Sequence, residues 1–149
     1  MLIINDPQVT LVIRSTVTLE TTVVMKLHLN NPDSNYQITG YRRSDDSVEI
    51  KIGDTFYKQS LILTSQHIQM WQVRDVSHLQ RSDFESLAEI DTELILLGTG
   101  LTFVFPSPAL SEPLMQRGIG LEVMDTAAAC RTYNILSGDG RNVTAALIV

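Results

Sequence analysis

The residues from 93 to 149 alternate between apolar runs and stretches with helix signals, and this alternation constrains the fold more than any other feature. Three apolar runs lie at 93–97, 121–124 and 143–149, and the last of them carries no charge. Strands that alternate with helices are typical of a largely parallel sheet with helices packed against it. The sequence therefore predicts an α/β fold class for this part of the chain.

Two helices are expected between these runs. Ser107-Pro108 favours a helix start and a helix to about Arg117, with a tighter turn before Pro113 and Gly118 as the residue after the helix. Asp125 or Thr126 is the expected cap of a second helix, which runs to about Leu136. A further short apolar run, 102–105, follows Gly98-Thr99-Gly100 and stops at Pro106.

The middle of the chain carries short strand signals. They lie at 36–40, 48–52, 55–58 and 61–63, and Gly53-Asp54 between the second and third predicts a hairpin. The residues around Trp71 fit either a short strand or an ordered loop. Ser82 and Glu85 have the spacing of a capping box, which predicts a helix of about two turns. We expect Phe84, Leu87 and Ala88 on its buried side.

Composition excludes several classes of protein. The chain has 149 residues, which suits one domain, and a net charge of −6, which leaves no basic patch for nucleic acid. A single cysteine cannot form an intrachain disulfide, so we expect a reducing, cytoplasmic location. No apolar run reaches the length of about 20 residues that a membrane span needs. His28, His67 and His78 lack metal-ligand spacing, and we predict no metal and no cofactor.

The first 24 residues differ from the remainder. They are rich in Val and Thr and fit either a strand pair or a loose extension. The sequence from Met25 onward is typical of the start of a domain. One hypothesis is that translation begins at Met25. We expect a poorly packed N-terminal extension over 1–24 and one α/β domain over 25–149.

The carboxyl ends of neighbouring parallel strands open on the same edge of a sheet, where ligands bind in such folds. The sequence predicts a candidate pocket at this edge. Its residues are Gly98, Thr99, Gly100, Asp125, Thr126, Cys130 and Arg131. A helix that begins at about residue 126 would direct backbone N–H groups at an anion there.

The single residues of this candidate pocket have alternative interpretations. Cys130 is a small buried apolar residue, a thiol that lines the pocket, or a nucleophile, and no histidine lies near it in sequence to act as its base. Arg131 either binds an anion or pairs with Asp125 or Glu122. Asp125 is a helix cap or a general base. We predict no catalytic residue, because no complete catalytic arrangement is visible.

Negative charge gathers between residues 75 and 93, where six carboxylates accompany one arginine, Arg81. One interpretation is a solvated helix face, and the other is a patch for a basic partner. The residues of this candidate acidic patch are Asp83, Glu85, Glu89, Asp91 and Glu93.

The segment RGIGLEVMDTAAACRTYNIL, with LILLGTG and TGY…SLILTS upstream, resembles a domain family of unknown function. Its members include a mitochondrial respiratory complex I (NADH:ubiquinone oxidoreductase) assembly factor and an adipogenesis-associated protein. The resemblance covers about 25–149 and departs from the family at Ala127, where glycine is common and the extra methyl group would narrow a pocket mouth. It implies a three-layer α/β fold with a mixed central β-sheet flanked by helices and additional β-strands.

The resemblance implies no catalytic mechanism, and it implies a protein partner among respiratory complex subunits or assembly proteins. Three functional hypotheses follow. The first is a non-enzymatic interaction protein. The second is a binder or enzyme for a small anionic ligand at the 98–100/125–131 edge. The third is a scaffold that forms a homodimer through its apolar final strand and residues near Trp71.

Overall fold

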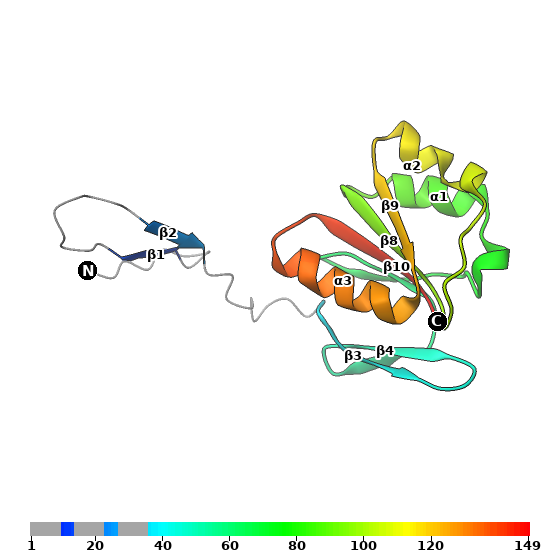
Figure 1. Cartoon of the computed structure of the whole chain (residues 1–149), viewed down its shortest axis with the longest axis horizontal. Helices are drawn as coiled ribbons and strands as arrows, with labels where there is room; N and C mark the ends of the chain where they lie inside the picture. The colour runs from blue at the N-terminus through cyan, green and yellow to red at the C-terminus, as the bar shows by residue number, and fades with distance from the viewer. Residues whose placement is uncertain (1–9, 14–22, 27–35) are drawn as a thin grey trace. The chain divides into compact units, whose positions relative to one another are not determined.

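A computed structural model describes residues 10–13, 23–26 and 36–149 (Figure 1). The chain divides into two units, Met1–Pro32 and Asp33–Val149. In the first unit, β1 (Thr10–Ile13) pairs antiparallel with β2 (Val23–Lys26). Strand β2 runs across the boundary expected after residue 24, and most of the predicted 1–24 extension lies outside the described residues.

The second unit is built on a five-stranded sheet. Its order is β7 (Ile68–Met70), β6 (Leu61–Leu63), β10 (Val143–Ile148), β8 (Leu94–Thr99) and β9 (Gly120–Met124). Strands β10, β8 and β9 are parallel to one another. Strand β6 pairs antiparallel with β10, and β7 pairs antiparallel with β6. The sheet is therefore mixed, and the parallel part is the part that the alternation of strands and helices predicted.

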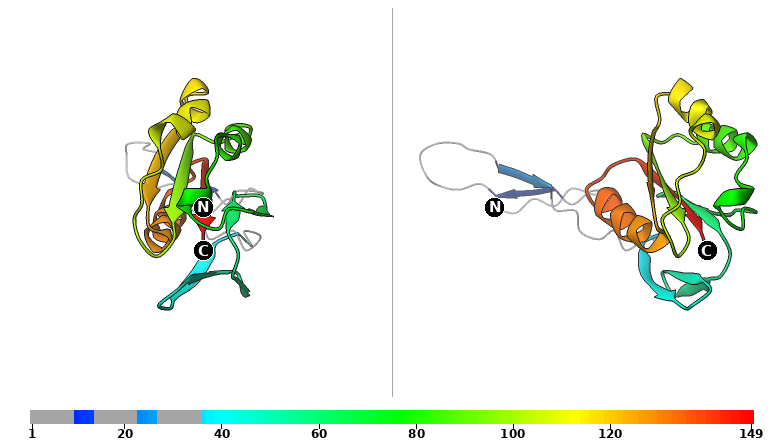
Figure 2. Two further views of the ribbon diagram at one scale, coloured as in Figure 1. Left: turned by 90° about the vertical axis from the view of Figure 1, so that its right-hand side faces the viewer. Right: turned by 45° about the vertical axis from the view of Figure 1, so that its right-hand side comes forward.

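Helices cover both faces of this sheet (Figure 2). The pair α1 (Arg81–Ala88) and α2 (Glu112–Gln116) lies on one face, and α3 (Thr126–Gly138) lies on the other. This confirms the expected three-layer α/β fold. Within the described ranges, no helix is long and apolar enough to cross a membrane.

A second, three-stranded sheet consists of β3 (Ile38–Arg43), β4 (Val48–Ile52) and β5 (Thr55–Tyr57). Alternate residues of β4 are buried, as the period-two pattern indicated. Gly53 has a φ of 57° in the turn to β5, which confirms the expected hairpin. The apolar face of this sheet joins α3 in covering the five-stranded sheet.

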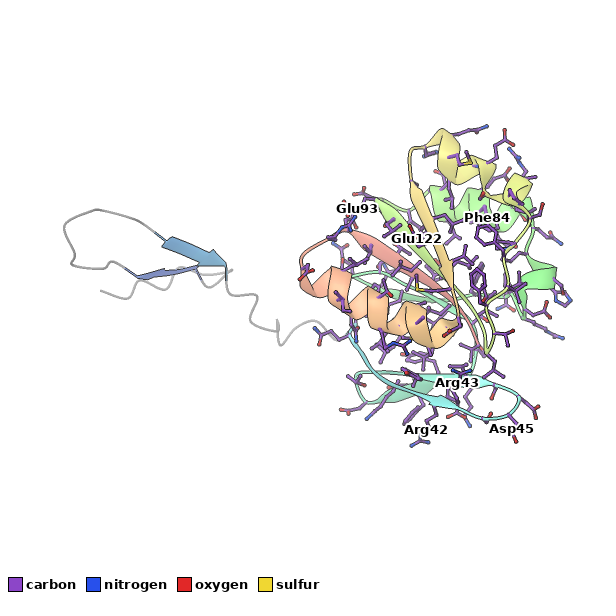
Figure 3. The ribbon with its side chains drawn as sticks, viewed as in Figure 1. Arg42, Arg43, Asp45, Phe84, Glu93 and Glu122 are labelled. Atoms are coloured by element: carbon purple, nitrogen blue, oxygen red, sulfur yellow. The ribbon has the colours of Figure 1, made fainter. Side chains whose placement is uncertain are left out.

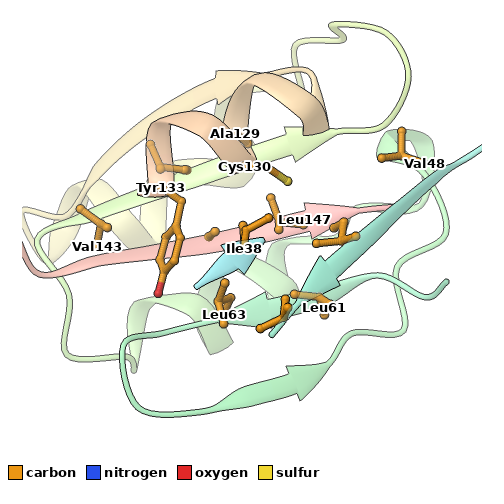
Figure 4. Close-up of a cluster of buried hydrophobic side chains, with 13 residues drawn as sticks. Ile38, Val48, Leu61, Leu63, Ala129, Cys130, Tyr133, Val143 and Leu147 are labelled. Carbon is orange, nitrogen blue, oxygen red and sulfur yellow. The ribbon is translucent and has the colours of Figure 1, made fainter. Parts of the chain in front are cut away.

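The hydrophobic core consists of two clusters on opposite faces of the five-stranded sheet. One contains Cys130, Tyr133 and Leu147, together with apolar residues of β4 and β6 (Figure 4). The other contains Phe84 and Leu87, as expected for the inner side of α1. Strand β10 is buried along its whole length, which explains its lack of charge. Because β10 lies between β6 and β8, it has no free edge for pairing with a second copy, and a homodimer stays a prediction.

The helix ends follow the sequence signals, with one shift. A 3-10 turn at Pro108–Ser111 precedes α2, as Pro113 predicted, and Gly118 follows it with a φ of 68°. The capping box predicted at Ser82 and Glu85 is wrong. Helix α1 instead begins at Arg81 after Gln80, whose N–H donates to Asp83 Oδ2 over 2.8 Å. Gln80 is therefore the N-cap residue, and Asp83 is the N3 residue of the capping box.

Candidate functional site

The sheet brings the two predicted loops together at one edge. In the parallel pairing of β8 and β9, Gly98 lies beside Met124, so the residues that follow each strand are neighbours. The chain from Gly98 to Gly100 thus meets the start of α3, as expected. The N–H of Thr126 donates to the carbonyl oxygen of Gly100 over 2.9 Å.

Thr126 is fully buried, and its hydroxyl connects the elements at this edge by hydrogen bonds. Its Oγ1 donates to the carbonyl oxygen of Ile148 over 2.6 Å and accepts from the N–H of Gly100 over 2.8 Å. One hydroxyl therefore joins the end of β10, the end of β8 and the start of α3. These bonds satisfy backbone groups that would otherwise be unpaired in the interior.

Glycine is required at 98 because helix α3 approaches the strand closely. A Cβ at this position would lie 2.9 Å from Thr126 Oγ1 and 3.0 Å from Thr126 Cα. Gly100 has a different role, since its φ of 94° makes the turn that leaves the strand. Gly98-Thr99-Gly100 thus acts as a packing and turn motif.

Thr99 anchors the chain that follows. Its Oγ1 donates to the carbonyl oxygen of Thr102 over 2.6 Å and lies 3.2 Å from the carbonyl oxygen of Met124. The same oxygen accepts from the N–H of Val104 over 3.2 Å. The apolar run at 102–105 is therefore folded back as a loop over the end of the sheet.

The N-terminus of α3 already uses two of its first three N–H groups within the protein. Thr126 N–H donates to Gly100, and Ala128 N–H donates to Asp125 Oδ1 over 2.9 Å. Asp125 is the N-cap, which confirms the structural interpretation of this residue. Anion binding at this edge stays a prediction that these contacts do not favour.

Cys130 is 1% exposed and lies in the core cluster among Tyr133 and Leu147 (Figure 4). Burial raises the pKa of its thiol to about 12, against a smaller opposing effect of Arg131. The thiolate is the reactive form, and at neutral pH this environment keeps the group protonated. The geometry matches the interpretation of Cys130 as a small core residue.

Arg131 lies on the exposed side of α3 and points to the smaller sheet. Its Nη1 donates to the hydroxyl of Tyr41 over 2.7 Å, and its guanidinium lies 5.9 Å from the centroid of that ring. The expected pairing with Asp125 or Glu122 is wrong, since no ion pair of Arg131 occurs among the described residues. Arg131 instead links α3 to β3.

The acidic segment is largely paired with arginines. Arg81 contacts Glu85 and Glu112, and Arg117 contacts Glu89. A groove of about 430 Å³ between α1 and α2 is lined by four of these residues, Arg81, Glu85, Glu89 and Arg117. Arg141 pairs in the same way with Glu93, which is labelled in Figure 3, over 2.7 Å. Asp91 is exposed and forms no ion pair within the described part of the chain.

Sequence reasoning missed one surface. Phe103, Val104 and Phe105 are 58%, 45% and 63% exposed, although their apolar character suggested burial. The bracketing residues Gly100 and Pro106 were the available signal, because they confine the run to a length that suits a loop as well as a strand. Their exposure makes them candidate binding residues.

The fold and this closed sheet edge define a small three-layer α/β domain. A family model described as "Protein of unknown function (DUF498/DUF598)" matches residues 41–148, well over half of the chain. The chain belongs to this family.

Curated relatives include "NADH dehydrogenase (ubiquinone) 1 alpha subcomplex assembly factor 3" of Mus musculus, 34% identical over 58% of this chain and 48% of the relative. The Xenopus tropicalis protein of the same name is 30% identical over 78% of this chain and 71% of the relative. The "13 kDa major membrane protein" of Francisella tularensis is 28% identical over 66% of this chain and 80% of the relative. This chain thus spans about half the length of the mouse relative.

Solved structures share the fold. An NMR structure of a Xanthomonas campestris protein is 35% identical with a TM-score of 0.66, and covers 83% of this chain and 92% of that one. A Bordetella pertussis protein described as a Mth938-like domain is 28% identical with a TM-score of 0.65. The match covers 83% of this chain and 92% of that one.

Proposed function

We propose that this protein is a non-enzymatic interaction protein that assists the assembly of a membrane-associated respiratory complex. The observation that carries the proposal is the similarity to relatives named as assembly factors of NADH dehydrogenase. The contacts at the sheet edge agree with it. Of the backbone N–H groups at 126–129 that would bind a small anion there, those of Thr126, Ala128 and Ala129 donate instead to protein acceptors. We therefore do not propose the anionic-ligand alternative.

The test is the amount of assembled NADH dehydrogenase on native gels from cells that lack this protein. We expect less assembled complex and recovery when the full chain is returned. The same amount of complex with and without the protein would contradict the proposal. Affinity purification of the tagged full chain, with mass spectrometry of a subunit or assembly protein that copurifies, identifies the partner.

Asp91 is the residue with which the role of the acidic segment can be tested, because reversing its charge disturbs no ion pair within the described residues. We expect Asp91→Lys to weaken partner binding in a salt-dependent way if the segment faces a basic partner. Asp139→Lys is the matched control, because Asp139 is an exposed carboxylate outside this segment and forms no ion pair within the described residues either. Partner binding that Asp91→Lys leaves unchanged would remove this segment from the proposal.

A further inference from the structure

Strand β9 forms one edge of the five-stranded sheet and is the least covered strand of its parallel part. Among the described residues, its only strand neighbour is β8 (Figure 1). None of the residues of β9 is buried, whereas all residues of β10 are. Parallel strands are normally covered on both faces, so β9 is a candidate for binding a further strand.

The backbone groups of β9 point in two directions. In a parallel pair, alternate residues direct their N–H and C=O groups to the neighbouring strand. The N–H of Gly120 donates to the carbonyl oxygen of Glu93 over 3.0 Å, which sets Gly120 and, two residues on, Glu122 towards β8. The N–H and C=O groups of Leu121 and Val123 therefore face outward, where the described part of the chain supplies no hydrogen-bond partner.

The molecule covers such groups elsewhere. At Ile38 in β3, the side-chain amide of Asn134 accepts from the backbone N–H over 3.1 Å and donates to the carbonyl oxygen over 2.6 Å. Proteins also protect open edges with prolines or bulges. Strand β9 contains no proline, and its pairing with β8 has no register shift. The edge is thus left in a form that accepts another strand.

The free backbone groups indicate what binds at this edge. Leu121 and Val123 each offer one donor and one acceptor, at the spacing that an extended polypeptide offers in return. A phosphate backbone supplies acceptors alone and would leave both carbonyl oxygens unpaired. The occupant that fits is therefore a β-strand.

Glu122 is the only charged residue of β9. Its side chain is exposed and forms no ion pair within the described residues (Figure 3). An opposite charge on the facing residue of a neighbouring strand is stabilising. Leu121 and Val123 pack against the apolar cluster that contains Phe84. The incoming strand should therefore carry Lys or Arg opposite Glu122, between two apolar residues.

The surrounding charges do not alter this preference. Two ion pairs near the start of the strand are each neutral: Glu93 with Arg141, and Glu89 with Arg117. Arg42 and Arg131 each lie over an aromatic ring of the smaller sheet. Beyond the carboxyl end of β9, Asp125 caps α3 and Arg43 contacts Leu101, and these two charges have opposite signs. Glu122 therefore determines the charge that an incoming strand meets at the centre of the edge.

We propose that the open edge of β9 binds an extended segment of a protein partner as an added β-strand, with Lys or Arg opposite Glu122. The proposal rests on the proposed function and names the element that holds the partner. A second copy fits less well. The register that pairs all four free groups of two antiparallel β9 strands sets Leu121 opposite Val123. The two Glu122 residues then face each other with Cα atoms about 4.5 Å apart, where like charges are destabilising.

The experiment selects peptides from a displayed random peptide library on the immobilised full chain. The selected peptides are then titrated against the native protein, Val123→Pro and the control Val123→Ala. Proline at 123 removes an outward N–H and no hydrogen bond to β8, which an edge strand tolerates. The alanine variant shortens the same side chain and keeps the N–H. Thermal unfolding of both variants shows whether the fold is kept.

We expect selected peptides that combine β-branched or aromatic residues with Lys or Arg. Their affinity should fall about tenfold or more in Val123→Pro, because one hydrogen bond is lost and the proline ring meets the incoming strand. Val123→Ala should have a much smaller effect. A library without binders, or equal affinity for the native protein and Val123→Pro, would overturn the proposal.

Amide hydrogen exchange of the native chain tests the edge without any variant. A bound peptide should slow exchange at Leu121 and Val123, and should leave exchange at Glu122 unchanged because its N–H already faces β8. Protection that appears at other residues and not at Leu121 and Val123 would place the peptide on another surface and refute the added strand.

Charge reversal tests the chemistry of the partner strand. Glu122→Lys should weaken binding of the same peptides about threefold or more, and added salt should reduce the difference. Asp139→Lys also reverses an exposed charge that forms no ion pair within the described residues, and it should leave the affinity unchanged. Equal affinity for the native protein and Glu122→Lys would overturn the choice of a basic partner strand.

Two assays separate a second copy and the proposed function. Concentration-dependent light scattering of the native chain that Val123→Pro abolishes would assign the edge to a second copy and overturn the proposal. In cells that lack the protein, a Val123→Pro chain that restores complex assembly fully would refute docking at β9 while the proposed function stands. A native chain that binds peptides at this edge without any effect on assembly would refute the proposed function alone.

Discussion

Among single residues, Thr126 should make a large polar contribution to stability, because its buried hydroxyl serves Ile148 and Gly100 at once. Thr126→Val keeps the shape and leaves both backbone groups unpaired, at a cost of about 1–3 kcal/mol each. We expect the free energy of unfolding in a denaturant titration to fall accordingly. Thr126→Ser keeps the hydroxyl and is the control. Equal stability of the two variants would show that the hydroxyl contributes little.

Gly98→Ala tests the close approach of α3 to β8. The added methyl group would lie 3.0 Å from backbone atom Cα of Thr126, which cannot move aside like a flexible side chain. We expect a loss of about 1–3 kcal/mol in the free energy of unfolding. Gly138→Ala has no neighbour within 4 Å and serves as the control, with an effect below about 1 kcal/mol. Similar values for the two substitutions would contradict the close contact.

Cys130 should make stability depend on alkaline pH. Burial raises its pKa from 9.0 to about 12, so the thiol ionises in the unfolded chain first. The stabilisation from keeping it protonated is complete below pH 9.0 and is lost as pH rises towards 12. Tyr133, whose pKa is also raised to about 12 by burial, adds to this loss.

The measurement is the free energy of unfolding against pH for native protein and Cys130→Ala. We expect a shallower decline above pH 9.0 in Cys130→Ala, because the contribution of Cys130 is then absent while that of Tyr133 remains. Parallel curves would contradict the assignment. In the folded protein near neutral pH, iodoacetamide should modify Cys130 far more slowly than in urea.

At the scale of elements, the end of α2 depends on Gly118. Its φ of 68° is left-handed, and a Cβ there would have no neighbour within 4 Å. Gly118→Ala therefore isolates the conformational cost, roughly 1–2 kcal/mol. Denaturant unfolding measures it, with Gly138→Ala again as the control. An unchanged midpoint would mean that the helix ends equally well without glycine.

The helices and strands of the second unit were largely predictable because their signals are local. Pro113 and Gly118 fixed the tighter turn and the end of α2, and the alternation over 48–52 fixed a half-buried strand. The start of α1 was missed because Gln80 and Asp83 share the spacing of Ser82 and Glu85. Local preference favours Ser82 as the N-cap, so the sequence signal selected the wrong one of two neighbouring capping patterns.

The candidate site was predictable in its location and less so in its contacts. Parallel strands imply that Gly98 and Thr126 meet. The partner of Arg131 was not predictable, since Tyr41 is 90 residues away in the sequence. The exposure of Phe103 depends on how Thr99 folds the loop back, which no apolar pattern encodes.

For the whole molecule, the division after Pro32 predicts that a shortened chain, residues 33–149, keeps its stability. Residues 36–149, the part of the chain whose burial the structure describes, supply two complete core clusters on the two faces of one sheet. We propose that this part is the folding domain and expect the same midpoint of thermal unfolding as for the full chain. A clearly lower midpoint would show that Met1–Pro32 stabilises the domain, and that the boundary belongs elsewhere.

The central place of β10 also governs the order in which the molecule forms. Strands β6 and β7 lie on one side of it and β8 and β9 on the other, so the two strand pairs share no sheet until β10 inserts between them. Of the described strands, β10 leaves the ribosome last. During synthesis, the pair β6–β7 and the pair β8–β9 therefore stay unjoined, each with an exposed strand edge. Exposed edges of this kind bind chaperones or pair with wrong strands. The five-stranded sheet is then completed only after β10 has been translated and has paired with both β6 and β8.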